Sequence, residues 1–139
     1  MQVCDVERVH HISCECFSTP WSLDSISREI INPVAYYLVA EVDHMVVGYG
    51  GMWCVLNEAE IINIAVSKAY QRKKVGAMLL KQLMLQAKQQ EVSTITLEVR
   101  QSNTAARKLY KSQGFVEIAR RKSYYKLPTE DAIIMQCIL

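Results

Sequence analysis

The segment 59–88 constrains the fold more than any other part of the chain. Residues 59–66 become nearly all apolar toward the end of the run, as in a strand that is covered on both faces. A polar and basic turn, 67–74, follows, and from Val75 onward apolar residues recur at the spacing of an amphipathic helix. The sequence therefore predicts a strand that leads through a basic turn into a helix packed against a sheet.

Helical and strand patterns alternate along the rest of the chain, without a linker or an internal repeat. Asp43-His44 predicts a hairpin turn, Ser22 and Ser102-Asn103 are candidate helix N-caps, and Gly114 is a candidate left-handed residue after a helix. The expected elements are helices over 5–17, 22–31, 75–88 and 103–110, and strands over 36–42, 45–56, 59–66, 92–100, 115–120 and 131–139. This order indicates an α/β or α+β domain with a mixed sheet. Only residues 1–3 precede the first helix, so we expect the first sheet edge to be short or built differently.

The length of 139 residues suits one domain of ordinary size. With 50% hydrophobic and 22% charged residues, the composition excludes a disordered chain or a collagen. No apolar run reaches the ~20 residues needed to cross a bilayer, and Met1 is not followed by the basic and apolar regions of a signal peptide. We therefore expect a cytoplasmic protein that has no membrane partner.

The cysteine pattern points away from disulfides and from zinc. An odd count of 5 at irregular spacing is expected to remain as thiols that pack as small core hydrophobes. One cluster has zinc-ligand chemistry but lacks paired Cys spacing with a second pair downstream: Cys4, His10, His11, Cys14 and Cys16. Core packing is the favoured interpretation of this cluster, and no metal site is expected.

Charge is distributed unevenly along the chain. Up to Glu60 there are 2 basic and 9 acidic residues, whereas from Ile61 onward there are 14 basic and 5 acidic residues. Between Lys68 and Lys88 lie six basic residues and no acidic one. Such a segment can hold a polyanion such as a nucleotide phosphate, or it can be a solvated helix face. No nucleic-acid recognition module is evident, so direct nucleic-acid recognition is not expected.

Several segments resemble one known superfamily. The run 71–77, Q-R-K-K-V-G-A, resembles the Q/R-x-x-G-x-G/A loop of the GCN5-related N-acetyltransferases (GNATs). Within the superfamily, further segments resemble the bacterial ribosomal-protein-alanine N-acetyltransferases: 17–22 (F-S-T-P-W-S), 63–66 (N-I-A-V), 97–100 (L-E-V-R) with Ser102-Asn103, 105–115, and Tyr124-Tyr125 through Glu130-Asp131-Ala132 to Met135. The resemblance runs from about Asp5 to the C-terminus and implies a single N-acetyltransferase domain over residues 1–139.

The resemblance also implies a site and its chemistry. Glu98 would be the general base, and Tyr110 the general acid toward the coenzyme A sulfur. The co-substrate acetyl-CoA would be bound by the strand residues Ile64, Ala65 and Val66, the loop residues Arg72, Lys73, Lys74, Val75, Gly76 and Ala77, and Asn103. The acceptor would be the α-amine of an N-terminal alanine of a small-subunit ribosomal protein, and transfer would be direct, without an acyl-enzyme.

Physical chemistry supports the loop assignment. Unpaired N–H groups and the helix dipole make a helix N-terminus a binding site for phosphate, and a glycine at position 76 allows a close backbone approach. The chain departs from the family pattern at Lys74, where the first glycine is usual. If this position requires positive φ, lysine costs on the order of 1 kcal/mol there, part of which its charge offsets at a phosphate.

The acceptor side is less sharply defined by sequence. Because ribosomal-protein tails are basic, we infer that the acidic first half of the chain lines the acceptor site. Trp21, Tyr124 and Tyr125 are candidates for a peptide groove and equally for the core. Two alternatives stay open: a peptide or small-amine acetyltransferase of broader specificity, and a non-catalytic acyl-CoA-binding module that regulates a partner.

Overall fold

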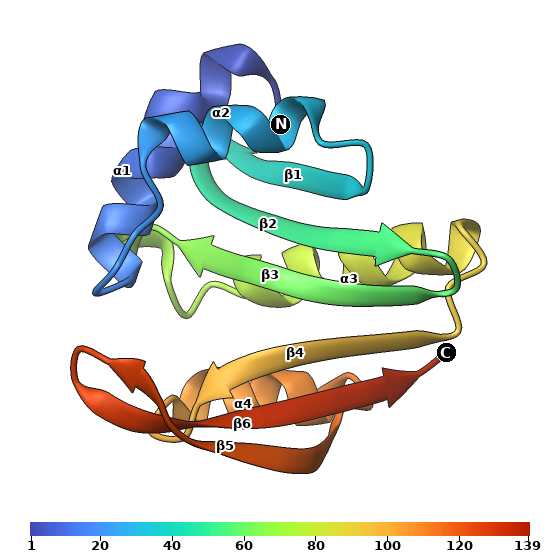
Figure 1. Ribbon diagram of the computed structural model, residues 1–139. Helices are drawn as coiled ribbons and strands as arrows, with labels where there is room; N and C mark the ends of the chain where they lie inside the picture. The colour runs from blue at the N-terminus through green and yellow to red at the C-terminus, as the bar shows by residue number, and fades with distance from the viewer.

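One six-stranded mixed sheet organises the molecule (Figure 1). The computed structural model describes all residues 1–139. In chain order the helices are α1 (Val6–Cys16), α2 (Leu23–Ile31), α3 (Val75–Gln89) and α4 (Thr104–Ser112), with short 3-10 turns at Val3–Asp5 and Lys68–Tyr70. The strands are β1 (Ala35–Val42), β2 (Met45–Val55), β3 (Glu58–Val66), β4 (Thr94–Arg100), β5 (Val116–Lys126) and β6 (Thr129–Ile138). None of the helices is long and apolar enough to cross a bilayer.

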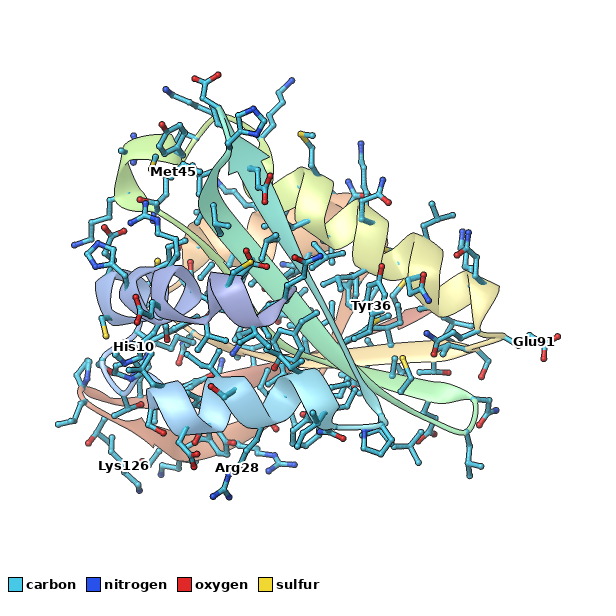
Figure 2. All side chains as sticks on the ribbon, turned by 90° about the horizontal axis from the view of Figure 1, so that it is seen from above. His10, Arg28, Tyr36, Met45, Glu91 and Lys126 are labelled. Carbon is cyan, nitrogen blue, oxygen red and sulfur yellow. The ribbon has the colours of Figure 1, made fainter.

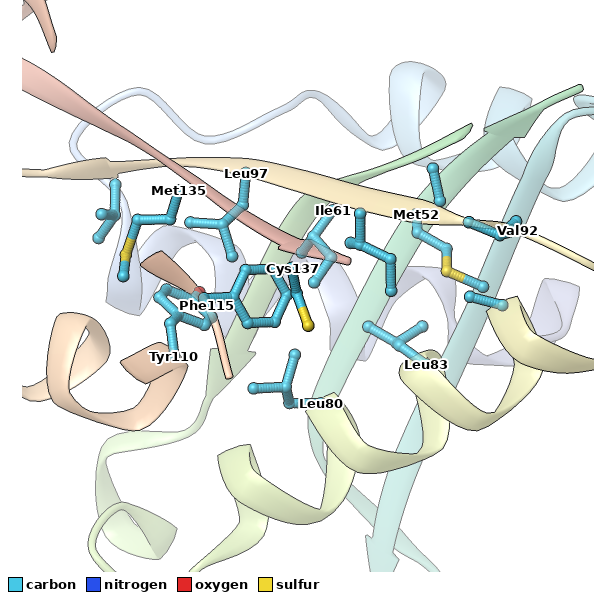
Figure 3. Close-up of a cluster of buried hydrophobic side chains, with 14 of the residues drawn as sticks. Met52, Ile61, Leu80, Leu83, Val92, Leu97, Tyr110, Phe115, Met135 and Cys137 are labelled. Atoms are coloured by element: carbon cyan, nitrogen blue, oxygen red, sulfur yellow. The ribbon is translucent and has the colours of Figure 1, made fainter. Parts of the chain in front are cut away.

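The strand order is β1-β2-β3-β4-β6-β5, and only the central pair, β3 and β4, is parallel. Helices cover both faces: Figure 2 shows α1 and α2 on one side of the sheet and α3 on the other. Two clusters fill the spaces between the layers. Residues of α1 and α2 pack with Val46, Tyr49 and Ala65 on one face. On the other face α3 and α4 bury a larger cluster that includes Leu80, Leu83, Leu97, Tyr110 and Phe115 (Figure 3).

The side chains of β4 alternate between a buried face and a more open face. Ile95, Leu97 and Val99 are buried in the α3 and α4 cluster. The intervening residues, Thr96, Glu98 and Arg100 among them, are only half-buried and face the side of α1 and α2. The face of β4 that carries Glu98 is therefore polar and open, while the opposite face anchors the strand.

The parallel pair separates along its length. The register between β3 and β4 runs from Glu58 opposite Thr94 to Ile61 opposite Leu97 and then stops. Both strands continue, to Val66 and Arg100, without pairing to each other, and Figure 1 shows their carboxyl ends diverging. An irregularity in the pairing of β2 with β3, between Gly51 and Met52, coincides with this separation. Backbone groups at the carboxyl end of β3 are thus left beside an opening in the sheet.

The helix boundaries and turns largely confirm the sequence predictions. Ser22 caps α2 by accepting a hydrogen bond from Ser25 N, at 3.1 Å. The Asp43-His44 turn has positive φ at both positions, and Gly114 is left-handed with φ 96°. Because a two-residue hairpin of this kind requires left-handed residues, the predicted turn between β1 and β2 is confirmed.

Residues 3–5 form a 3-10 turn and no strand precedes α1, so this edge of the sheet is built differently, as expected. Two other expectations differ from the structure. The strand expected to end at residue 120 continues to Lys126; it is an exposed edge strand, so no apolar alternation marks it. The cysteines do not share the core: Cys137 is buried, but Cys4 and Cys14 are exposed.

Candidate active site

The turn between β3 and α3 presents unpaired backbone N–H groups to solvent. Lys74 stands at the N-cap with φ 66° and ψ 13°, and no side chain caps the helix. Arg72 is also left-handed, with φ 62°. Gln71 Nε2 donates to the carbonyl of Val66 at 3.0 Å and ties the turn to the end of β3. The first N–H groups of α3 and the positive end of its dipole therefore face outward among basic side chains, a geometry that suits a phosphate.

Gly76 lies in the first turn of α3 with space around it. A Cβ atom at this position would lie 3.7 Å from Leu109 Cδ2 and 3.8 Å from Val66 Cγ2, which are ordinary contact distances. Its φ is not left-handed. Neither the backbone nor the neighbouring side chains require glycine here, so the structure has room for a methyl group at this position.

Two adjoining pockets meet at Glu98, on the open face of β4. The larger, of about 470 Å³, lies toward β5 and has Glu60 and Tyr124 in its wall. The smaller, of about 240 Å³, lies toward α1 and α4 and has Asn63, Asn103 and Tyr110 in its wall. Six residues line both: Thr19, Trp21, Ile62, Glu98, Arg100 and Tyr125. The segment after α1 thus forms one wall of both pockets. Trp21, Tyr124 and Tyr125, for which the sequence allowed either a peptide groove or the core, line these pockets.

Glu98 is accessible from these pockets. Its side chain is 22% exposed, and Oε1 lies 3.6 Å from Arg121 Nε on β5. Hydrogen bonding to Glu98 and its negative charge raise the pKa of the Tyr124 hydroxyl. One carboxylate therefore faces a pocket with a cation and a phenol beside it, which is an arrangement that can accept a proton from a bound amine.

Tyr110 is buried on α4 and packs against Phe115, with ring centroids 5.8 Å apart. Burial raises the pKa of its phenol to about 12. The phenol therefore stays protonated at neutral pH and can serve as a proton donor. The sequence-predicted pair, Glu98 and Tyr110, comes from different elements, and the fold brings both into the wall of the smaller pocket.

The other sequence-predicted residues occupy different environments. Asn103 caps α4, where its Oδ1 accepts a hydrogen bond from Ala106 N at 3.2 Å. The carbonyl of Val66 already accepts bonds from Gln71 Nε2 and Cys16 Sγ, which occupy both of its lone pairs. Ile64 pairs with Gly50 of β2 on one side and lines the opening on the other.

Arg100 is a site residue that the sequence did not single out. Its guanidinium lies 4.3 Å from the Tyr125 ring centroid. It donates to four oxygens at 3.0–3.2 Å: the carbonyls of Leu127 and Pro128, Glu130 Oε2 and Ser18 Oγ. These partners belong to the β5–β6 turn, to the start of β6 and to the segment after α1, so Arg100 ties the two walls of the groove together. Its sequence signals were its place in the 97–100 segment that carries the resemblance and its position two residues after Glu98 on the same strand face, but neither assigned it a role.

The acidic first half of the chain does not line the acceptor side as expected. Of its nine acidic residues, only Glu60 reaches the two pockets beside Glu98. Glu29 is buried and accepts a hydrogen bond from Trp53 Nε1 at 2.6 Å, and Glu15 accepts one from Lys68 N at 3.1 Å. Both carboxylates stabilise the fold, because each accepts a hydrogen bond from an N–H group of another element.

The histidines and cysteines near the N-terminus form no metal-binding group. Cys14 Sγ lies 3.7 Å from His10 Nε2, but no three His, Cys, Asp or Glu side chains converge anywhere in the structure. Burial raises the pKa of the Cys54 and Cys137 thiols. Both therefore remain thiols at neutral pH, unlike the thiolate that a covalent mechanism requires.

Comparison with known proteins agrees with this geometry. The model of the Acetyltransferase (GNAT) family matches residues 6–115. The [ribosomal protein bS18]-alanine N-acetyltransferase of Haemophilus influenzae is 36% identical over 144 residues, covering 100% of this chain and 96% of that protein. Among solved structures, the ribosomal-protein-S18-alanine N-acetyltransferase of Escherichia coli is 33% identical with a TM-score of 0.92, covering 99% and 90% of the two chains. Ard1 of Thermoplasma volcanium is 26% identical with a TM-score of 0.93, covering 100% and 94%. On sequence, fold and site geometry together, the chain belongs to the GNAT family of acetyltransferases.

Proposed function

We propose that this protein transfers the acetyl group of acetyl-CoA to the α-amine of an N-terminal alanine of a small-subunit ribosomal protein in the cytoplasm, and that residues 1–139 act as one catalytic domain. The observation that carries the proposal is the meeting of Glu98 and Tyr110 at one pocket where β3 and β4 separate. The relatives named above support the acceptor, since their names specify the alanine of a ribosomal protein.

The coenzyme would approach from the α3 side of the sheet. The N–H groups of 75–77, the cations of 72–74 and the vacant Cβ position of Gly76 fit a pyrophosphate at the start of α3. Backbone groups of the 64–66 segment would bind the pantetheine arm in the opening between the strands. Asn103, at the start of α4 and in the pocket wall, would contact the arm nearer its sulfur.

The transfer needs one proton acceptor and one proton donor. An α-ammonium has a reference pKa of ~7.7–8.0, so Glu98 can take its proton directly or through water. The amine nitrogen then forms a bond to the thioester carbon, and a strand N–H stabilises the oxyanion that develops. When the carbon–sulfur bond breaks, Tyr110 gives its proton to the departing thiolate. The nitrogen loses its second proton as the amide forms; this proton restores the Tyr110 phenol, and Glu98 releases its own proton to solvent. The products are an N-acetylated peptide and coenzyme A.

A basic acceptor fits the larger pocket. Glu60 is exposed in its wall and makes no ion pair with the protein, whereas the nearby Glu98 and Arg100 both do. A cationic side chain near the start of the peptide can therefore pair with Glu60. Glu60→Lys is expected to raise the peptide KM while it leaves the KM for acetyl-CoA unchanged. An unchanged peptide KM would remove Glu60 from the acceptor site.

The decisive experiment follows the acceptor directly. A synthetic peptide with the ribosomal N-terminal sequence of the host is incubated with acetyl-CoA and the protein, and mass spectrometry locates any acetyl group. We expect acetylation at the α-amine and a strong decrease with Glu98→Gln and Tyr110→Phe. Glu91→Gln, at an exposed residue after α3, is the matched control. Binding of acetyl-CoA without acetylation of the peptide would point to another amine acceptor or to the non-catalytic module.

A further inference from the structure

One buried oxygen of a residue that lines the smaller pocket has no partner. Asn63 Oδ1, on β3, is buried from solvent and makes no hydrogen bond within the protein. A buried acceptor without a donor is unfavourable compared with the same group in water. Such an atom on a residue that lines a pocket is therefore suited to a donor that arrives with a ligand.

The position of Asn63 on β3 shows from which side this donor comes. Ala65, two residues further along the strand, packs against α1 and α2, and residues i and i+2 of a strand share a face. The pocket wall next to Asn63 is correspondingly formed by Ser13 and Phe17 at the end of α1, and by Trp21. The phosphate-binding turn at α3 lies on the opposite face of the sheet. The donor for Asn63 therefore does not come from the nucleotide part of the coenzyme.

The other residues in the pocket wall narrow the donor further. The same pocket contains Glu98, the proposed base for the α-amine. The acceptor group that comes closest to both side chains is the terminal amino group itself.

We propose that Asn63 is a positioning residue that accepts a hydrogen bond from the α-amino group of the acceptor. The inference rests on the proposed function and adds a contact to it. An α-ammonium carries three N–H groups: one proton goes to Glu98, and a second N–H donates to Asn63 Oδ1. With these two directions fixed, the lone pair that deprotonation frees has a restricted orientation, which favours attack on the thioester carbon.

An internal partner is the competing explanation. Tyr37, Gly51 and Asn63 occupy one register row across β1, β2 and β3, and the ring of Tyr37 takes the space that a Cβ on Gly51 would need. The Tyr37 hydroxyl is also buried without a hydrogen bond. A water between this hydroxyl and Asn63 would satisfy both atoms with no contribution from a ligand. Asn63→Ala separates the two explanations, because only a contact with the ligand predicts a loss of amine-dependent binding. Tyr37→Phe is the control for an indirect effect through this row of residues.

The test measures how much the acceptor's amino group contributes to binding. Two peptides are titrated into the protein saturated with coenzyme A: one begins with alanine, and the other with a propionyl group in its place, which lacks only the amine. Wild type, Asn63→Ala, Asn63→Asp and Tyr37→Phe are compared by calorimetry, and thermal unfolding confirms that each variant is folded. Acetylation by wild type is measured in parallel.

We expect wild type to prefer the alanyl peptide, and Asn63→Ala to lose about tenfold of this preference, the value of one hydrogen bond to a charged donor. Asn63→Asp keeps an acceptor oxygen and should keep the preference, and Tyr37→Phe should leave it unchanged. An unchanged preference in Asn63→Ala, or an equal loss in Tyr37→Phe, overturns the inference. Equal binding of both peptides by wild type also overturns the inference about Asn63. If wild type binds the alanyl peptide but acetylates no peptide, the proposed function is contradicted instead.

Discussion

Lys74 gives a prediction in which stability and coenzyme affinity change in opposite directions. The residue is left-handed, with φ 66°, at the N-cap of α3. A left-handed conformation costs a non-glycine residue about 1–2 kcal/mol, and a change to glycine removes this cost. Glycine also makes the unfolded chain more flexible, which lowers the free energy of unfolding by about 0.5–1 kcal/mol. Lys74→Gly should therefore stabilise the fold by about 0.5–1 kcal/mol. With an unfolding entropy of about 0.29 kcal/mol/K for 139 residues, Tm should rise by about 2–3 °C.

The affinity for coenzyme A should decrease in the same variant. An exposed cation beside a phosphate contributes up to about 1 kcal/mol, so the loss of Lys74 should weaken binding about twofold to fivefold, and less at high salt. Lys74→Ala is the matched variant: it removes the charge but keeps the left-handed cost, so it should lose affinity without gaining Tm. Lys81→Ala, an exposed lysine within α3, should change neither.

Thermal unfolding and calorimetric titration of coenzyme A at two salt concentrations measure both effects. The reasoning about the backbone is refuted if Lys74→Gly is no more stable than Lys74→Ala. The reasoning about the charge is refuted if both variants bind coenzyme A as tightly as wild type does.

Three further predictions concern the phosphate turn, the groove and the proton donor. Gly76→Ala should keep or slightly raise Tm, since the structure has room for the methyl group, while it lowers the affinity for coenzyme A at least severalfold in a titration. Arg100→Lys cannot reproduce four hydrogen bonds to two walls, so hydrogen exchange in the β5–β6 turn should accelerate and kcat/KM for the peptide should fall about tenfold or more. Because burial keeps the pKa of Tyr110 at about 12, kcat at saturating substrates should rise as the amine loses its proton near pH 8 and then stay level up to roughly pH 11. A decline of kcat near pH 9 that Tyr110→Phe abolishes would contradict the assignment of that buried phenol.

Local chemistry accounts for the parts of the fold that the sequence predicted correctly. The Asp43-His44 turn, the Ser22 and Asn103 caps and left-handed Gly114 all depend on residues within a few positions of one another. Alternation along β4 similarly identified which side chains share a face with Glu98. Where the pattern carried no apolar signal, as in the exposed edge strand β5, the prediction ended too early.

The turn before α3, where we propose that the phosphates bind, is the part of the proposed site that depends on local sequence alone, because a helix start, a glycine and a run of cations are contiguous. Tertiary structure brings Glu98 and Tyr110, which the family resemblance had implied, to one pocket, and it alone decided the four contacts of Arg100 and the unpartnered oxygen of Asn63. Each depends on strands β3 and β4 separating after Ile61 and Leu97, with α1, α4 and the β5–β6 turn packed around the opening. Hydrophobic periodicity records which face of an element is buried, but it contains no information about where two paired strands part or which distant side chains then meet.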